Sequence, residues 1–204
     1  MGCTVFRART AGLKYGAPLS LGAMKEGIEV IEVKKPSECS ATELQNFAAL
    51  VLAGGEVTEV GLEARIKKAE VLIFLAQDNC LKGIAAVKNP GQYYKNRVFS
   101  KAQASIEANE LQSELGWVFV LPSSRRAGFS HKLVKAALAA TSGRAIFATS
   151  RLDNAPMHKV LKAHGFSSQG KAYASTRGKQ KLVLFVRTAA QQGVQGDAPK
   201  AARP

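Results

Sequence analysis

Short apolar runs alternate along the chain with segments whose apolar residues recur at helical spacing. Runs of β-branched and aliphatic residues bounded by turn residues predict strands, and apolar residues three or four positions apart predict helices. The predicted strands cover residues 27–33, 71–76, 83–87, 115–121, 145–149, 166–173 and 181–187. The predicted helices follow Ser40, pass through Leu62 and Ile66, and cover residues 128–141 and 155–164. Strand–helix alternation in the second half favours crossover connections on a mixed sheet, so we predict an α/β fold of the α+β type.

The clearest boundary signals surround the first predicted helix. Ser40 stands three residues before Glu43, which is the spacing of a capping box, and Gly54 and Gly55 follow the last apolar position. By contrast, residues 89–110 are too many for a simple connection and are rich in Tyr, Lys, Ser and Ala. Such a segment either has a function or contains short helices of its own, and we interpret it as a substrate loop.

Length and composition favour one domain. A chain of 204 residues with 46% hydrophobic content is long enough for one substantial core and short for two. We expect the domain over residues 26–188, a flexible leader over residues 1–25 and a disordered tail over residues 189–204. The leader carries basic residues without acids, and the tail is rich in Ala, Gln, Gly and Pro. No apolar stretch approaches the roughly 20 residues that cross a bilayer, so we predict no membrane span.

The formal net charge of +14 is high for this length. Neutralisation of phosphates by Lys and Arg drives non-specific nucleic-acid binding, so a nucleic acid and an anionic cofactor are both candidate partners. The basic residues are scattered, however, and no helix-turn-helix, zinc-finger or RNP-type motif accompanies them. Cys3, Cys39 and Cys80 are widely spaced and form no Cys-x-x-Cys or Cys/His cluster. This spacing predicts a reducing compartment, here the cytoplasm, and no metal site.

The most informative segment runs from Glu114 through a predicted strand and a Pro-Ser-Ser turn into a helix. Arg125, Gly128 and Ser130 lie where this helix begins. The first N–H groups of a helix have no intrahelical acceptor and the helix dipole is positive there, so backbone amides can hold a pyrophosphate. Gly128 and the small Ser130 allow the backbone to approach phosphates closely. Arg125 and Arg126 add charged donors.

This segment resembles the acetyl-CoA motif of the GNAT superfamily of N-acetyltransferases, in which Val-x-Pro-x-x-Arg-x-x-Gly-x-Gly/Ala leads into a helix. The motif is matched by Val120, Pro122, Arg125 and Gly128, and Ser130 is a conservative departure. Further along, residues 154–166 are similar to the family's second motif, whose Asn contacts the pantetheine arm or the backbone near it. Two motifs in the right order and spacing are more specific than a phosphate-binding Gly loop alone.

The resemblance implies the GNAT fold, a central mixed, mostly antiparallel twisted sheet of about six to seven strands flanked by helices. It also implies acetyl-CoA as cosubstrate, a small-molecule or protein amine as acceptor, and direct attack without a covalent enzyme intermediate. In the family, a backbone N–H of the strand before the motif holds the thioester carbonyl. The residues that the resemblance assigns to acetyl-CoA are Val118, Phe119, Val120, Arg125, Arg126, Ala127, Gly128, Phe129, Ser130 and Asn154.

The catalytic residues match the family less fully. A lysine-like amine has a reference pKa of about 10.4, so removing its proton at pH 7 costs about 4 to 5 kcal/mol and requires a base. Glu114 matches a catalytic Glu of the histone-acetylating branch and is the candidate base. The Tyr that protonates the leaving thiolate in many members is replaced by Leu161. The candidate substitutes are Tyr173, His158 and the Tyr93-Tyr94 pair, and this pair is also the candidate substrate-binding element.

Two alternatives come from other classes of protein. The first is a nucleic-acid-directed protein, either an acyltransferase acting on tRNA or a modified base or a basic nucleic-acid-binding module, which the charge alone supports. The second is a non-catalytic acetyl-CoA-binding protein, suggested by Leu161. The GNAT scaffold serves antibiotics, polyamines, amino acids, protein N-termini and lysines, so the resemblance does not select the acceptor. The edge strands of such a sheet are compatible with a homodimer.

Overall fold

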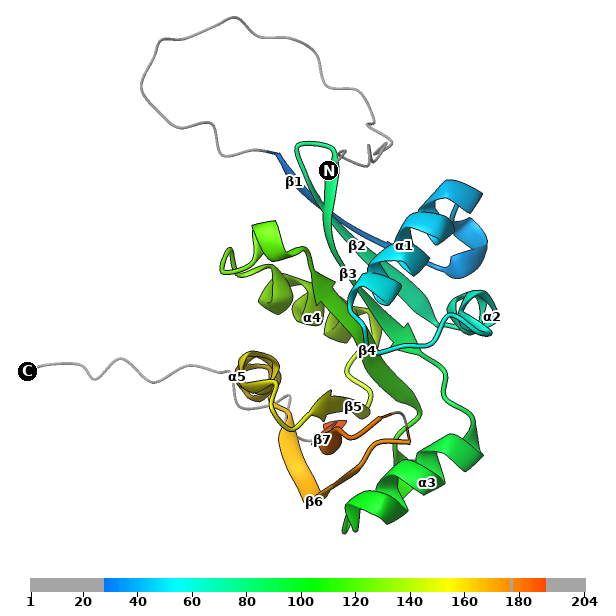
Figure 1. The fold of residues 1–204 in the computed structure, drawn as a ribbon, viewed down its shortest axis with the longest axis vertical. Helices are drawn as coiled ribbons and strands as arrows, with labels where there is room; N and C mark the ends of the chain where they lie inside the picture. Colours follow the sequence, from blue (N-terminus) through cyan, green and yellow to red (C-terminus); the bar gives the residue numbers. More distant parts are fainter. Residues whose placement is uncertain (1–27, 177, 190–204) are drawn as a thin grey trace, which may run out of the picture.

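A seven-stranded sheet runs through the molecule (Figure 1). The computed structural model describes residues 28–176 and 178–189. The strands follow the order β1-β2-β3-β4-β5-β7-β6, and β4 pairs with β5 in parallel while the other described pairs are antiparallel. Their bounds are β1 Glu29–Lys34, β2 Val71–Gln77, β3 Cys80–Lys88, β4 Ser113–Val120, β5 Ile146–Arg151, β6 Ser167–Ala174 and β7 Lys181–Arg187. The predicted mixed, mostly antiparallel sheet is confirmed.

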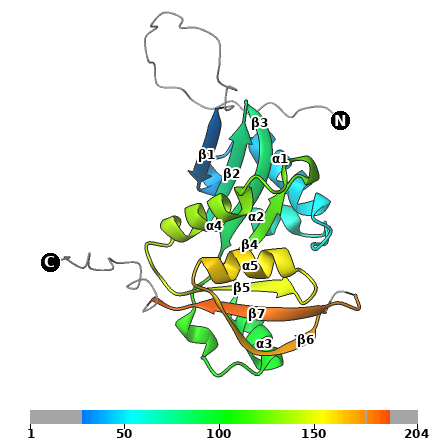
Figure 2. The same ribbon diagram turned by 90° about the vertical axis from the view of Figure 1, so that its left-hand side faces the viewer.

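Helices cover both faces of this sheet, as the two views in Figures 1 and 2 show. One face packs against α1 (Ala41–Ala53), α2 (Leu62–Lys67) and α3 (Gln92–Ala102). The other face packs against α4 (Phe129–Ala140) and α5 (Ala155–Ala163). Short 3-10 turns occur at Pro36–Glu38, Ala108–Glu110 and Pro122–Ser124.

Strand β2 illustrates why the apolar runs of the sequence become strands. Leu72 and Phe74 pack in the core under α1 and α2, whereas Ile73 and Leu75 pack in the core under α4. Successive side chains of a strand point to opposite faces of the sheet. A strand covered on both faces therefore has a continuous apolar run rather than an alternating pattern.

The predicted boundaries of the first helix are confirmed. Ser40 Oγ accepts a hydrogen bond from the Glu43 N–H at 3.2 Å, and the Glu43 carboxylate accepts one from the Ser40 N–H at 2.7 Å. Gly54 is the C-cap of α1. Because the cap residues satisfy N–H groups that no helical carbonyl reaches, this boundary could be predicted from local sequence alone.

Of the two alternatives for residues 89–110, the one with short helices is confirmed, because the segment contains α3 and a 3-10 turn, and its interpretation as a loop is wrong for most of its length. Val98, Phe99 and Ala102 of α3 are buried in a core that includes β5, β6 and β7. In the sequence, only this narrow apolar stripe indicates a helix, because the other positions of α3 are polar. Tertiary packing therefore decides the structure of a segment whose composition is typical of a loop.

The expected leader over residues 1–25 lies outside the described residues, as does the expected tail from residue 190 onward. The expected domain over residues 26–188 starts two residues before the described part of the chain. Within the described ranges, none of the helices has the length and apolar character needed to cross a bilayer.

Gly170 of β6 provides a test of the packing between the sheet and α3. Its φ is +64°, and an added Cβ would collide with the backbone carbonyl of Ala102 at the end of α3. We expect Gly170→Ala to lower the free energy of unfolding by at least about 3 kcal/mol, because backbone strain and steric overlap add. Urea unfolding followed by circular dichroism measures the loss.

Gly55→Ala is the matched control for this prediction. Gly55 has a φ of +72°, and its added Cβ would have no heavy atom within 4 Å. Its loss should be limited to the backbone strain, about 1 to 2 kcal/mol. Equal losses in the two variants would show that β6 and α3 do not pack as closely as described.

Candidate active site

Strands β4 and β5 pair over a short length and then part. Ser113–Leu115 pairs with Ile146–Ala148. Beyond these pairs β4 continues along β3 as far as Val120, and β5 continues along β7 as far as Arg151. In the described part of the chain no further pair joins the two strands, so the facing backbone edges of residues 116–120 and 149–151 are unpaired with each other. We call this opening of the sheet the β4–β5 divergence.

A β-bulge in β4 lies at the start of the divergence. The pairing register shifts between Ile84 and Ala86 of β3. Two residues of β4, Trp117 and Val118, therefore lie opposite a single residue of β3. Trp117 has a φ of +53°, which is uncommon for a bulky side chain. Bulges re-aim side chains and backbone groups and occur often beside active sites. The indole packs against Phe47 of α1, with ring centroids 6.0 Å apart.

The turn from β4 into α4 presents unpaired backbone donors. Arg126 has a φ of +70° and Gly128, the N-cap of α4, has a φ of +75°. Among the described residues, the amides of residues 126–130 donate to no protein acceptor. They precede a helix of 12 residues whose dipole places partial positive charge at this end. Unpaired amides at a helix start can accept an anion, and the assignment of the acetyl-CoA pyrophosphate to this turn stays a prediction.

The side chains around this turn have mixed environments. Arg125 and Arg126 are exposed, and Arg125 Nε donates to the Val120 carbonyl at 3.4 Å. Phe129 is buried and fixes the first turn of α4 in the core. The space around Gly128 is open, because an added Cβ would meet no atom within 4 Å. The backbone is thus accessible at the position where the motif has glycine.

Helix α5 begins at the second predicted motif. Asn154 is its N-cap, and its side-chain oxygen accepts a hydrogen bond from the Met157 N–H at 3.2 Å. Leu161 is fully buried in the core beneath α4 and α5. The hydrocarbon side chain at position 161 packs between helices and sheet and offers no proton donor.

Glu114 stands at the centre of a buried polar cluster on the α3 side of the sheet. Its carboxylate is 3% exposed, its Oε1 lies 2.8 Å from Lys88 Nζ, and Tyr94 donates a hydrogen bond to the same oxygen at 3.3 Å. Lys88 Nζ also lies 5.3 Å from the centre of the Trp117 ring. A buried carboxylate needs such partners, because charge without them is costly in a core.

Tyr173 of β6 lies close to this cluster. Its side chain is 8% exposed, and among the described residues its hydroxyl has no hydrogen-bond partner. Burial raises the pKa of Tyr173, the Glu114 carboxylate raises it further, and Arg97 opposes both. Burial and Glu114 likewise raise the pKa of Tyr94. Both phenols therefore keep their protons at neutral pH.

The sequence comparisons give one family match and no curated relative. The model of the family described as FR47-like protein matches residues 92–175, which include α3, Glu114, the bulge in β4 and the turn into α4. No curated protein matches the chain.

Solved structures supply the deciding observation. A GNAT-family protein from Desulfovibrio desulfuricans is 15% identical, with a TM-score of 0.57 over 79% of this chain and 99% of that chain. The described part of the chain therefore has the fold of the GNAT acetyltransferases. Another similar structure is yncA from Salmonella typhimurium, solved with its cofactor acetyl-CoA, at 14% identity and a TM-score of 0.55 over 86% of this chain and 99% of that one.

A third GNAT-like structure is the ribosomal-protein-S18-alanine N-acetyltransferase from Escherichia coli. It is 13% identical and has a TM-score of 0.56 over 86% of this chain and 99% of that chain. The similarity of fold thus extends over nearly the whole length of these proteins. At these identities it concerns the fold and not the acceptor.

The structure brings some of the predicted GNAT site residues together and separates others. The buried Glu114 and Tyr173 and the half-buried Tyr94 lie in one group. Tyr93 points elsewhere, since its side chain is 80% exposed. His158 lies apart from the group, with its Nε2 2.9 Å from the Arg151 carbonyl on the α5 side.

Sequence reasoning missed Lys88 as a member of the site. Lys88 ends β3 and stands directly opposite Glu114 in the β3–β4 register. The sequence shows Lys88 near the strand that precedes α3, but only the β3–β4 register shows that Lys88 lies opposite Glu114. The structure also has an ion pair near the divergence, in which Arg151 Nη1 lies 2.9 Å from Glu56 Oε1 in the loop after α1.

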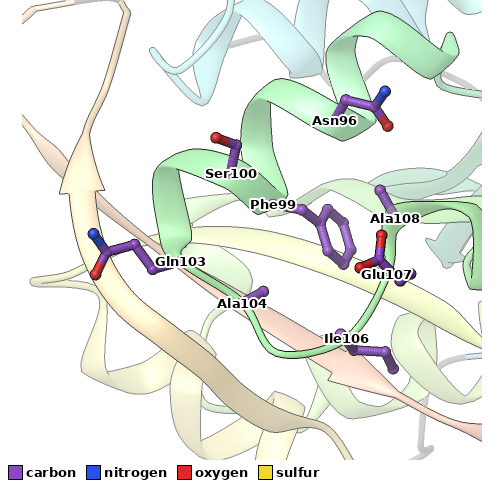
Figure 3. Close-up of a pocket in the computed structure, with 8 residues that line it drawn as sticks. All are labelled: Asn96, Phe99, Ser100, Gln103, Ala104, Ile106, Glu107 and Ala108. Carbon is purple, nitrogen blue, oxygen red and sulfur yellow. The ribbon is translucent and has the colours of Figure 1, made fainter.

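Other clusters among the described residues lack comparable chemistry. A hollow of about 290 Å³ lies beside α3 and the segment after it, and Figure 3 labels Asn96 and Ser100 of α3, its C-cap Gln103, and Glu107 among the residues that line it. Glu107 is the sole ionisable residue among those that line it. His131 and His164 lie 3.3 Å apart between Nδ1 and Nε2 on the α4–α5 surface. Over the described ranges, no three His, Cys, Asp or Glu residues gather as metal ligands.

Proposed function

We propose that the chain is an N-acetyltransferase that moves an acetyl group from acetyl-CoA to a primary amine by direct attack, without a covalent enzyme intermediate. The observation that carries the proposal is the row of unpaired amides at residues 126–130, which lies at the end of β4 where that strand has parted from β5. The GNAT fold and the acetyl-CoA bound to the similar protein yncA support it.

Acetyl-CoA fits the residues of this region. Its pyrophosphate would be held by the amides of residues 126–130, with Arg125 and Arg126 adding positive charge. Backbone N–H groups of Val118, Phe119 and Val120 border the divergence and are candidates to hold the thioester carbonyl. Asn154 would contribute on the β5 side. When bound, acetyl-CoA supplies an acetyl carbon that an amine can attack.

Glu114 is the proposed acceptor of the amine's proton, directly or through water. An ammonium near pH 7 needs such a base, since its deprotonation costs about 4 to 5 kcal/mol. The carboxylate is held in place by Lys88 and Tyr94. Tyr173, the candidate acid of the sequence analysis, has a hydroxyl without a protein partner among the described residues, and burial raises its pKa, so it offers a hydrogen bond and keeps its proton. The coenzyme A thiolate can leave without a dedicated acid, because a thiol has a reference pKa of about 8.5. We propose that the acceptor, a small molecule or a protein amine, is acetylated in the cytoplasm.

Calorimetric titration with acetyl-CoA tests this function. We expect saturable binding with a dissociation constant in the micromolar range, about −8 kcal/mol. S-acetylpantetheine, which carries the thioester but no pyrophosphate, should bind at least about tenfold more weakly, because it leaves the amides of the turn without an anion. Equal affinities for the two ligands would contradict a phosphate site at residues 126–130, and absence of acetyl-CoA binding would overturn the proposal.

A further inference from the structure

A second, smaller cavity lies between α3 and the β6–β7 hairpin. It has a volume of about 40 Å³. The residues that line it and that carry polar groups are Tyr94, Arg97, Lys101, Tyr173 and Thr176. A single water needs about 10 to 15 Å³ of such space, so the cavity can take a group of a few atoms. It lies on the same side of the sheet as Glu114.

One wall of this cavity contains a buried donor without a protein partner. The Tyr173 side chain is 8% exposed, and in the part of the chain that the structure describes its hydroxyl makes no hydrogen bond. Leaving a buried hydroxyl unpaired costs about 1 to 3 kcal/mol, so such groups are rare without a reason. Because the hydroxyl keeps its proton at neutral pH, it can donate to an oxyanion in the cavity.

The same cavity carries positive charge from α3. Arg97 and Lys101 are four residues apart and so share one face of the helix. Within residues 28–176 and 178–189, neither forms an ion pair with a carboxylate. The Arg97 guanidinium lies 5.9 Å from the centre of the Tyr94 ring, which helps to fix its position. Two cations and a phenol donor around a small space match a carboxylate.

Tyr94 connects this cavity to the proposed base. Its ring lines the cavity, and its hydroxyl donates to Glu114 Oε1 at 3.3 Å. We propose that the cavity is an acceptor subsite that binds a carboxylate, so that the preferred substrate is a small amine carrying a carboxylate, such as an amino acid. This inference rests on the proposed acetyltransferase function. The amine would lie beside Glu114 while the carboxylate is held by Arg97, Lys101 and the Tyr173 hydroxyl.

Binding is tested first without acetyl transfer. The chain contains four tyrosines, so ring-labelled ¹³C-tyrosine gives few NMR signals, which the Tyr94→Phe and Tyr173→Phe variants assign. We expect γ-aminobutyrate to shift the Tyr173 signal saturably, whereas butylamine, which lacks only the carboxylate, does not at equal ionic strength. Arg97→Ala should weaken the γ-aminobutyrate effect about tenfold, given the strength of a charge-assisted hydrogen bond. Lys159→Ala, which removes an exposed cation on α5, should leave it unchanged.

Rates of acetyl transfer provide the second test of the subsite. Acetylation rates are compared for pairs that differ by the carboxylate, such as γ-aminobutyrate and butylamine or L-phenylalanine and phenethylamine. We expect kcat/KM to be at least about tenfold higher for the amine that carries a carboxylate than for its partner without one. Arg97→Ala should remove this difference. Acetylation of amines without that preference, and without a Tyr173 shift, would overturn the subsite while sustaining the function. A Tyr173 shift without turnover of any amine would contradict the function but sustain the subsite.

Discussion

Gly128→Asp is expected to weaken acetyl-CoA binding by at least about 100-fold, which corresponds to about 2.8 kcal/mol. The substitution places a carboxylate beside the amides that are proposed to hold the pyrophosphate, and like charges in such contact cost several kcal/mol. An added Cβ at position 128 would meet no atom within 4 Å, so the fold should accept the side chain. The positive φ of +75° at this position strains any side chain by up to about 1 to 2 kcal/mol, a loss that the Asn control shares. Calorimetry gives the affinity.

Gly128→Asn is the matched control for this charge. Asn has nearly the same shape as Asp and tolerates the positive φ of +75° at this position. The Asn variant should bind acetyl-CoA with an affinity within about tenfold of that of the native chain, because the Asn side chain occupies space beside the amides but adds no charge. Equal losses in the Asp and Asn variants would refute the electrostatic argument. Native affinity in both would show that the anion is bound elsewhere.

Glu114→Gln is expected to lower kcat by about 100-fold to 1,000-fold while leaving acetyl-CoA affinity unchanged. General-base catalysis contributes about this much, and Gln keeps the shape of the side chain without its ability to accept the proton. Steady-state kinetics with an accepted amine measure the effect.

A double variant distinguishes a structural role of Glu114 from a catalytic one. Removing its charge leaves the ammonium of Lys88, 2.8 Å away in the native chain, without its partner in a largely buried place, and this lowers stability. Glu114→Gln combined with Lys88→Met removes both charges and should recover stability by urea unfolding. Activity should stay low in the double variant. Recovery of kcat together with stability would mean that Glu114 serves the fold alone.

Local sequence signals sufficed for much of the fold. The Ser40 and Glu43 cap, the glycine after α1 and the continuous apolar run of β2 all follow from interactions within a few residues or from burial on both faces. The turn into α4 could also be predicted, because a glycine and two arginines at the start of a helix are visible in the local sequence. These features need no knowledge of the partner elements.

The rest of the site depends on contacts between distant segments. Tyr94 reaches Glu114 because α3 packs against the part of the sheet that contains β5, β6 and β7. The neighbouring Tyr93 lies on the exposed side of α3. The Trp117 bulge arises from the β3–β4 register, which the sequence of β4 alone does not reveal. The Lys88 partner of Glu114 depends on the same register. The sequence indicates helix α3 only weakly, because its buried apolar stripe is short and the rest of its surface is polar.

Product-resolved acetyl transfer tests the central claim most directly. The purified chain is incubated with acetyl-CoA and a panel of amines, amino acids and peptides, and mass spectrometry follows free coenzyme A and each N-acetylated product. The account predicts equal amounts of coenzyme A and N-acetyl product for at least one amine, and loss of both in Glu114→Gln. Tight binding of acetyl-CoA with no acetylated product from any amine of the panel would contradict it and identify a non-catalytic acetyl-CoA-binding protein.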